Sequence, residues 1–298
     1  MMRPFLTTAF GALVLSGSLL AQQPAPPAVV PSTEAAAPAR TGPVLSDAEM
    51  EEFLLRAKVL KTKGVSKGVT GTLRATLSDG KLTHDAQIQY IDQTLQQFSG
   101  SQGGVEFNFR DSWTFNVAAY KIDRLIGFNV VPVSIARRHD YKEAAFTWWL
   151  DDVMMHEDDR LKLKTDAQKN PELKGKSEPP DAEVWNQQMQ MVRLFDQLIA
   201  NIDRNLGNII ISSDWRVWPI DHTRAFRTNK ELKTPANVTR IDRGILERLK
   251  VLDKETLRRA TGKHLTTFQI DAVLARRDLI VKRLEGFGPG ALFDRTGW

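Results

Sequence analysis

Residues 201–226 carry the most informative pattern of this 298-residue chain. They read Asn201-Ile-Asp-Arg-Asn-Leu-Gly-Asn208, then an apolar run and a polar turn, then Val217-Trp-Pro-Ile-Asp-His-Thr-Arg-Ala-Phe226. A long segment with helical apolar spacing precedes the first motif, and two short apolar runs between the motifs predict a β-hairpin. The pattern therefore predicts a carboxylate (Asp203) after a buried helix, an amide (Asn208) five residues later, and a second carboxylate (Asp221) after the hairpin.

These three groups suit phosphoryl transfer. In that chemistry one Asp accepts or orients the attacking hydroxyl, while an Asn and another Asp hold magnesium against the nucleotide phosphates. Magnesium prefers oxygen ligands and keeps several waters, so a small ligand set is sufficient. The spacing from Asp203 to Asn208 also matches the catalytic loop of protein kinases. The plain alternative is that Asp203 caps the helix or pairs with Arg204.

The rest of the chain predicts an α+β fold. Ser46 and Glu49 form a capping-box pattern at the start of a helix that is expected to continue through Leu60. Strand patterns at residues 73–77, 84–91, 130–136 and 144–150 surround a helix pattern at 112–126, which follows a Gly-rich gap. A polar loop is expected at 156–180, and further helices at 184–202 and within 240–284. The charged pair Arg276-Arg277 is expected on the surface.

A second motif lies upstream of the first. It reads Asn116-Val-Ala-Ala-Tyr-Lys-Ile-Asp-Arg-Leu-Ile-Gly-Phe128 and is followed by Val131-Pro132. This block, together with the motifs at 203–208 and 220–226, resembles the atypical protein-kinase-like fold. The similarity is to the secretory-pathway kinases of the Golgi casein kinase type and to the phosphatidylinositol 3-/4-kinase-like group. The motifs fall within residues 112–226, and weaker similarity in the order of elements extends over 59–284.

The resemblance implies a two-lobed α+β fold. A small β-rich N-lobe would occupy residues 46–152, and a mostly helical C-lobe would occupy 153–298. The cofactors implied are ATP and Mg²⁺ or Mn²⁺. Asp203 would be the catalytic base, while Asn208 and Asp221 would be the metal ligands.

The resemblance also implies contacts to the nucleotide. The turn containing Gly68 and Gly71 would cover the phosphates, and residues 151–153 would form the hinge beside the adenine. Arg204 and Arg224 would brace the loop or contact phosphate.

One feature of the family is missing from this sequence. Kinases pair a strand Lys with a helix Glu to hold the α- and β-phosphates, but those positions here are Gln89 and Asn116. A pair of amides can form a hydrogen bond and supplies no cation. Residues that could compensate are, as cations, Arg74, Lys67 and Lys81 and, as acids, Glu106 and Asp111. The predicted cofactor-binding set is therefore Gly68, Gly71, Arg74, Gln89, Asn116 and Arg204.

The N-terminal sequence and the composition indicate an exported protein. Arg3 followed by an apolar run at residues 6–20 predicts a signal peptide at 1–21, and the Pro- and Ala-rich residues 22–45 predict a disordered linker. The chain has no Cys, which favours a bacterial periplasmic or secreted protein over a eukaryotic secreted one. A net charge of +5 without a basic stripe argues against nucleic-acid binding. No later segment is long enough for a stable membrane span.

The sequence therefore predicts an exported, metal-dependent phosphotransferase. Its partners would be a nucleotide and an acceptor hydroxyl on a protein, a lipid head group or a sugar. The alternative is a pseudokinase-like binding module that retains the fold without catalysis, and the Gln89 and Asn116 substitutions support it. A third hypothesis is that the chain is an envelope scaffold protein without a ligand.

Overall fold

Ser46 begins the first helix of the chain. In this computed structural model, which describes residues 45–65, 72–100, 104–296 and 298, the Ser46 hydroxyl accepts a hydrogen bond from the N–H of Glu49. The Glu49 carboxylate accepts one in return from the N–H of Ser46, so the predicted capping box of α1 (Asp47–Arg56) is confirmed. The prediction that the helix reaches Leu60 is wrong. Ala57 has an extended backbone, and Leu60 lies exposed in strand β1 (Lys58–Gly64).

Several predictions concern residues outside the described ranges. They are the signal peptide at residues 1–21 and nearly all of the linker at 22–45. The phosphate-covering glycines Gly68 and Gly71, and the cationic candidate Lys67, also lie outside those ranges.

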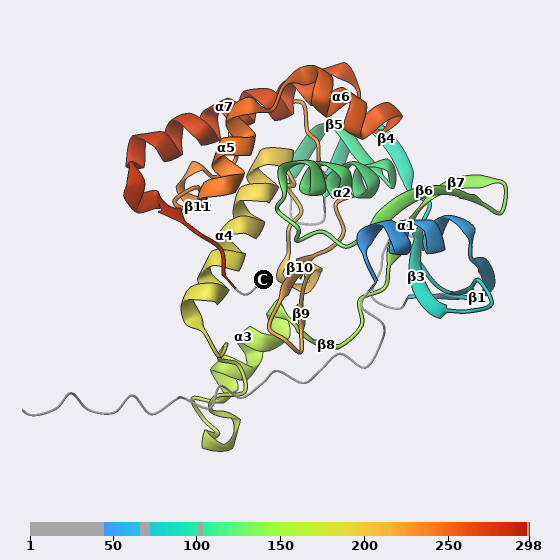
Figure 1. Cartoon of the computed structure of the whole chain (residues 1–298), viewed down its shortest axis with the longest axis horizontal. Coiled ribbons are helices and arrows are strands. Elements are labelled where there is room, and N and C mark those ends of the chain that lie inside the picture. Colours follow the sequence, from blue (N-terminus) through green and yellow to red (C-terminus); the bar gives the residue numbers. More distant parts are fainter. Residues whose placement is uncertain (1–44, 66–71, 101–103, 297) are drawn as a thin grey trace, which may run out of the picture. The chain divides into compact units, whose positions relative to one another are not determined.

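A five-stranded antiparallel sheet forms the N-terminal region, with β1 to β3 in blue and cyan and β6 and β7 in green in Figure 1. Its strand order is β1-β2-β3-β7-β6, with β2 (Leu73–Ser78), β3 (Thr83–Gln89), β6 (Ser134–His139) and β7 (Lys142–Trp148). Successive side chains of a strand point to opposite faces. The fully buried Ala86 and Ile88 therefore lie on one face, and Gln87 and Gln89 lie on the other.

Helices cover both faces of this sheet. α2 (Thr114–Ile126) contacts β6 and β7 on the Gln89 face, where Val117 packs with Ala145, the register partner of Gln89. α1 contacts the same two strands on the opposite face, where the ring of Phe53 meets Trp148 edge to face at 5.7 Å between centroids. This packing brings the start of α2 next to Gln89.

A separate hairpin lies between β3 and α2 in the sequence. It consists of β4 (Asp92–Gly100) and β5 (Gly104–Ser112), which pair antiparallel. The sequence analysis predicts no element there, because most side chains of β4 are exposed and show no apolar alternation. At the base of the hairpin the N–H of Ser112 donates to the carbonyl of Thr223 at 2.9 Å. The end of β5 therefore lies against the segment that follows Asp221.

The C-terminal region is mostly helical, as predicted, which confirms the α+β fold class. The helices are α3 (Glu157–Asp166), α4 (Ala182–Ile199), α5 (Arg243–Val251), α6 (Lys254–Thr261) and α7 (Thr267–Phe287), shown from green to red in Figure 1. A sheet of order β10-β9-β8 contains β8 (Val153–His156), β9 (Ile209–Ser212) and β10 (Val217–Pro219), and a parallel pair joins β11 (Ile241–Asp242) to β12 (Leu292–Phe293). The hairpin predicted after Asn208 is confirmed as β9–β10. Within the described ranges, no helix is long and apolar enough to cross a membrane.

Two predictions about charged segments of this region are wrong. Residues 156–180 contain α3, which has no apolar period and is held by a buried ion pair between Glu157 and Arg160, with a closest N–O distance of 2.6 Å. Arg276 is fully buried, and its Nε donates to the carbonyl of Leu198 at 2.8 Å. Arg160 and Arg276 are buried because they make polar contacts, and hydrophobic periodicity does not detect such contacts.

Asp123 anchors the C-terminal end of α2. Its side chain is fully buried and accepts hydrogen bonds from the backbone N–H groups of Val130 (3.0 Å) and Val131 (3.3 Å) and from the guanidinium of Arg124. Burial raises the pKa of Asp123 to about 6, although Arg124 and the two amides oppose this rise. The hydrogen bonds of Asp123 therefore fix the turn from α2 toward β6, although burying the carboxylate is itself unfavourable.

This burial predicts a pH dependence of stability. The pKa of Asp123 is higher in the folded chain than its ordinary value of 3.8, so its contribution to stability is full below about pH 4. That contribution is lost as the pH rises through about 6, which lowers the free energy of unfolding by roughly 3 kcal/mol at most. Asp123→Asn keeps an oxygen acceptor for Val130 and Val131 and should flatten the profile between pH 4 and 6. Urea unfolding of both proteins across this range measures the effect, and parallel profiles would contradict it.

Candidate functional site

Arg204 lies at the centre of the loop that joins α4 to β9. Its Nε and Nη2 donate to the carboxylate of Asp196, in the last turn of α4, at 2.9 and 3.1 Å. Its Nη1 donates to the carbonyl of Asn208 at 2.9 Å and to the carbonyl of Ile220. One guanidinium thus ties the end of a buried helix to both sequence motifs. Of the two roles left open for Arg204, bracing the loop agrees with these contacts, because protein oxygens accept once from Nε, once from Nη2 and twice from Nη1.

The Arg204–Asp196 pair predicts a large effect on stability. Both side chains are close to nine-tenths buried, and Asp196 also accepts from Asn201 Nδ2 at 3.0 Å. Arg204→Met leaves the Asp196 carboxylate buried without its cation, which should lower the free energy of unfolding by about 3–5 kcal/mol. Arg243→Met, which removes an exposed ion pair with Asp294, is the matched control and should cost no more than about 1 kcal/mol. Equal losses in urea unfolding would show that Arg204 is not a brace.

Asp203 is the exposed carboxylate of this loop. Its side chain is 51% exposed and pairs with Arg224 at 3.1 Å, while Arg204 pairs with Asp196 instead. The backbone N–H of Asp203 faces Asn201 Oδ1 at 3.4 Å. Asp203 therefore neither caps a helix nor pairs with Arg204, and its carboxylate is accessible from solvent.

Asn208 and Asp221 lie at the same end of the β9–β10 hairpin. Ile209 pairs in register with Pro219, and the N–H of Ile220 donates to the carbonyl of Asn208 at 3.0 Å. Asp221 has a left-handed backbone with φ of 56°, an uncommon conformation that Asp and Asn tolerate better than most residues. Its Oδ1 accepts from the Thr223 hydroxyl at 3.0 Å.

Asp111, at the end of β5, joins this group. It is 6% exposed, and burial raises its pKa. The Thr223 hydroxyl and Arg224 lower that pKa, whereas the negative charges of Asp221 and Asp203 raise it further. The carboxylates of three separate segments therefore lie close enough to influence one another. Sequence reasoning offered Asp111 only as one of two replacement acids, and its position depends on the unpredicted β4–β5 hairpin.

Gln89 and Asn116 form the amide pair that the sequence indicates. Asn116 Nδ2 donates to Gln89 Oε1 at 2.5 Å, and both side chains are buried. Asn116 Oδ1 in turn accepts from the backbone N–H of His222 at 2.8 Å. Burial holds the pKa of His222 well below its usual range, so this side chain is neutral. The pair thus joins β3, α2 and the segment after Asp221 without any charge.

The described cationic candidates of the N-terminal sheet make no hydrogen bond with this pair among the described contacts. Arg74 donates to Asp85 at 2.6 Å and lies over the ring of Trp149 at 4.3 Å. Lys81 lies in the turn between β2 and β3, at the end of these strands opposite to Gln89. Lys63 of β1 pairs in register with Arg74 and shares its face of the sheet. Sequence analysis did not single out Lys63, because strand register is needed to place it.

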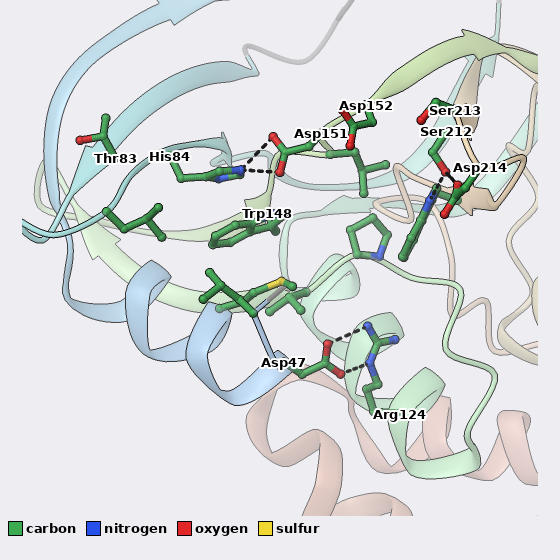
Figure 2. A pocket seen from close by; sticks show the side chains of 17 residues that line it. Asp47, Thr83, His84, Arg124, Trp148, Asp151, Asp152, Ser212, Ser213 and Asp214 are labelled. Carbon is green, nitrogen blue, oxygen red and sulfur yellow. Dashed lines mark hydrogen bonds and ion pairs between the residues drawn. The ribbon is translucent and has the colours of Figure 1, made fainter. Parts of the chain in front are cut away.

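Two cavities lie near these elements. A cavity of about 820 Å³ is bounded by Ile202, next to Asp203, by residues 225–230, and by Arg110 of β5. The second, of about 420 Å³, has residues 150–152 in its lining (Figure 2). There Asp151 faces His84 at 3.0 Å. None of Asp203, Asn208 and Asp221 lines either cavity, and the first cavity is the one bounded by the residue next to Asp203.

The donors around Asn208 and Asp221 fit a hard divalent cation. All of them are oxygens, the ligand type that Mg²⁺ and Mn²⁺ prefer. Asp111 Oδ1 is buried and has no hydrogen-bond partner in the described part of the chain. In that same part, no group of three His, Cys, Asp or Glu side chains meets the geometry of a metal site. A metal bound here would therefore rely on the Asn208 amide as well as on carboxylates.

The fold is similar to solved structures of hydra Fam20 and of the Golgi casein kinase, although no protein-family model matches the chain and no curated protein matches its sequence. The structure of hydra Fam20 with sugar has a TM-score of 0.60 and 15% identity over 84% of this chain and 93% of that chain. The Golgi casein kinase has a TM-score of 0.54 at 13% identity, and its structure with Mn/ADP bound has 0.53 at 12%. The alignment to each of these two structures covers 83% of this chain and 78% of the casein kinase chain. The resemblance to the phosphatidylinositol 3-/4-kinase-like group stays a prediction. The chain thus has the kinase-like fold of Fam20 and the Golgi casein kinase.

Proposed function

We propose that this chain is a metal-dependent phosphotransferase that moves a phosphoryl group from a nucleotide to a hydroxyl. The observation that carries the proposal is the set of contacts made by Arg204. Through the carbonyls of Asn208 and Ile220 it fixes the loop of Asp203 and the residue before Asp221 together. A solvent-accessible carboxylate and a pair of oxygen donors are thereby held by one buried ion pair.

Each residue has a role in this proposal. Asp203 accepts or orients the proton of the acceptor hydroxyl, and Arg224 keeps its carboxylate in place at 3.1 Å. Asn208 and Asp221 supply oxygen ligands. These residues would hold Mg²⁺ or Mn²⁺, whose charge would offset that of the nucleotide phosphates. The 820 Å³ cavity is lined by Ile202, the residue before Asp203, and is the proposed place for the acceptor.

The choice of cofactor rests on a structural neighbour. The Golgi casein kinase has been solved with Mn/ADP bound, and this chain shares its fold. That likeness supports ATP with Mn²⁺ or Mg²⁺ as the pair to test first. The acceptor classes remain those of the sequence prediction: a protein, a lipid head group or a sugar.

The direct test combines binding and transfer. Thermal unfolding with ATP plus MgCl₂ or MnCl₂ should show stabilisation, because a ligand that binds only the folded state adds to its stability. Label from γ-labelled ATP should then appear on the protein, on an added acceptor or in free phosphate. A chain that shows neither stabilisation nor transfer with either metal is a scaffold, and the proposal fails.

The second candidate is a pseudokinase-like binding module. The neutral Gln89–Asn116 pair favours it, since it removes the cation that kinases use on the α- and β-phosphates. Stabilisation by ATP and metal without any transfer of label would select this candidate.

We also propose that the chain is exported to the periplasm or secreted, on the basis of the signal-peptide pattern at residues 1–21. Sequencing the N-terminus of the protein recovered outside the cytoplasm tests this, and an intact Met1 would contradict cleavage.

A further inference from the structure

Asp111 is a buried carboxylate with an unsatisfied oxygen. The residue is 6% exposed, and its Oδ1 has no hydrogen-bond partner among the described residues. Leaving an ionised carboxylate in this state is costly, because burial removes the water that would otherwise solvate it. Native chains retain such groups when a partner is supplied from outside the fold or when the group serves a site.

The surroundings of Asp111 show what kind of partner is missing. The Thr223 hydroxyl donates to Asp221 Oδ1 at 3.0 Å and also forms a hydrogen bond with Asp111. A hydroxyl has one proton, so it cannot donate to both carboxylates at once. Two acids therefore share one donor, and a positive charge between them would satisfy both.

The nearby cations make ion pairs with other acids, although the charge of Arg224 also lowers the pKa of Asp111. Arg224 pairs with Asp203 at 3.1 Å, and Arg110, next to Asp111 in the chain, faces Asp92 at 3.9 Å. The backbone also fixes the position of Asp111, since the N–H of Ser112 donates to the Thr223 carbonyl at 2.9 Å. The end of β5 is thus attached to the segment that carries Asp221.

We propose that Asp111 is a ligand of the same divalent cation as Asn208 and Asp221. The proposal rests on the metal site of the proposed function and adds a third oxygen donor, from the end of strand β5. The side-chain amide of Asn116 is committed to Gln89 and to His222. Two carboxylates and one amide leave further coordination positions for water or phosphate oxygens.

The test uses MnCl₂ alone, without nucleotide, on the full chain. In EDTA, Asp111→Asn should unfold at the same temperature as the wild type or higher, because it removes a buried negative charge whose Oδ1 has no hydrogen-bond partner among the described residues. Added Mn²⁺ should stabilise the wild type and bind the variant at least about 10-fold more weakly by calorimetry. Asp111→Ser serves as a second variant if Asp111→Asn fails to fold. Asp166→Asn, which changes an exposed acid at the end of α3, should behave like the wild type.

The outcomes separate this inference from the proposed function. If Asp111→Asn is less stable in EDTA and binds Mn²⁺ like the wild type, Asp111 is structural and the inference is wrong. If Asp221→Asn then still loses Mn²⁺ binding, the metal site of the proposed function stands without Asp111. If the wild type binds no Mn²⁺ and transfers no label, both the inference and the proposed function fail.

Discussion

Asp203→Asn should lower the rate of label transfer from γ-labelled ATP by about 10³-fold, within the range that general base catalysis supplies. The amide has the shape of the carboxylate but cannot take a proton from the attacking hydroxyl. Asp203 is half exposed and is not part of the brace, which Arg204 and Asp196 form. The stability of the chain, and its stabilisation by ATP and metal, should therefore change little.

The measurement compares initial rates of label transfer and thermal unfolding for wild type and variant under the same metal and nucleotide concentrations. Asp166→Asn is the control for a change of one exposed acid. Equal transfer rates would remove Asp203 from the role of base. Loss of binding together with transfer would show instead that Asp203 holds the metal or the nucleotide.

Asp221→Asn should abolish the metal-dependent part of the stabilisation by ATP, and transfer with it. For a wild type saturated at about 100 times the dissociation constant, that stabilisation is about 2.7 kcal/mol. Asn is the suitable substitution because Asp221 has φ of 56°, a conformation that Asn accepts more readily than Ala does. The change therefore removes a charged ligand without adding backbone strain.

Unfolding with ATP alone, with metal alone and with both identifies the metal-dependent part. In EDTA, the variant should unfold at the same temperature as the wild type. Among the described contacts, the Asp221 side chain accepts a hydrogen bond only from Thr223, which Asn can also accept. A variant that retains the full response to metal and ATP would show that Asp221 is not a ligand.

The sequence predicted the α+β fold class and the elements around the two motifs, because these depend on local patterns. The β9–β10 hairpin and the pairing of Gln89 with Asn116 follow from spacing and from the resemblance. α3 and the buried Arg276 were missed because polar contacts hold them. Hydrophobic periodicity detects apolar burial only.

The part of the site that the sequence did not predict depends on tertiary contacts. Asp196 is the clearest case, because its partner Arg204 lies beyond the end of α4. The sequence did contain a signal for this pair. Asp196 lies on the buried side of α4, and a buried acid needs a cationic or hydrogen-bonding partner. The β4–β5 hairpin, which carries Asp111 to Asp221, gave no comparable signal because β4 is mostly exposed.

The amide pair of Gln89 and Asn116 has a consequence for the conditions in which the chain can work. An ion pair between a strand and a helix weakens as dissolved salt rises and breaks when either partner titrates. Two amides have no charge for ions to screen and no proton to gain or lose in water at ordinary acidity. The link from β3 through α2 to His222 is therefore expected to persist in brine or mild acid alike.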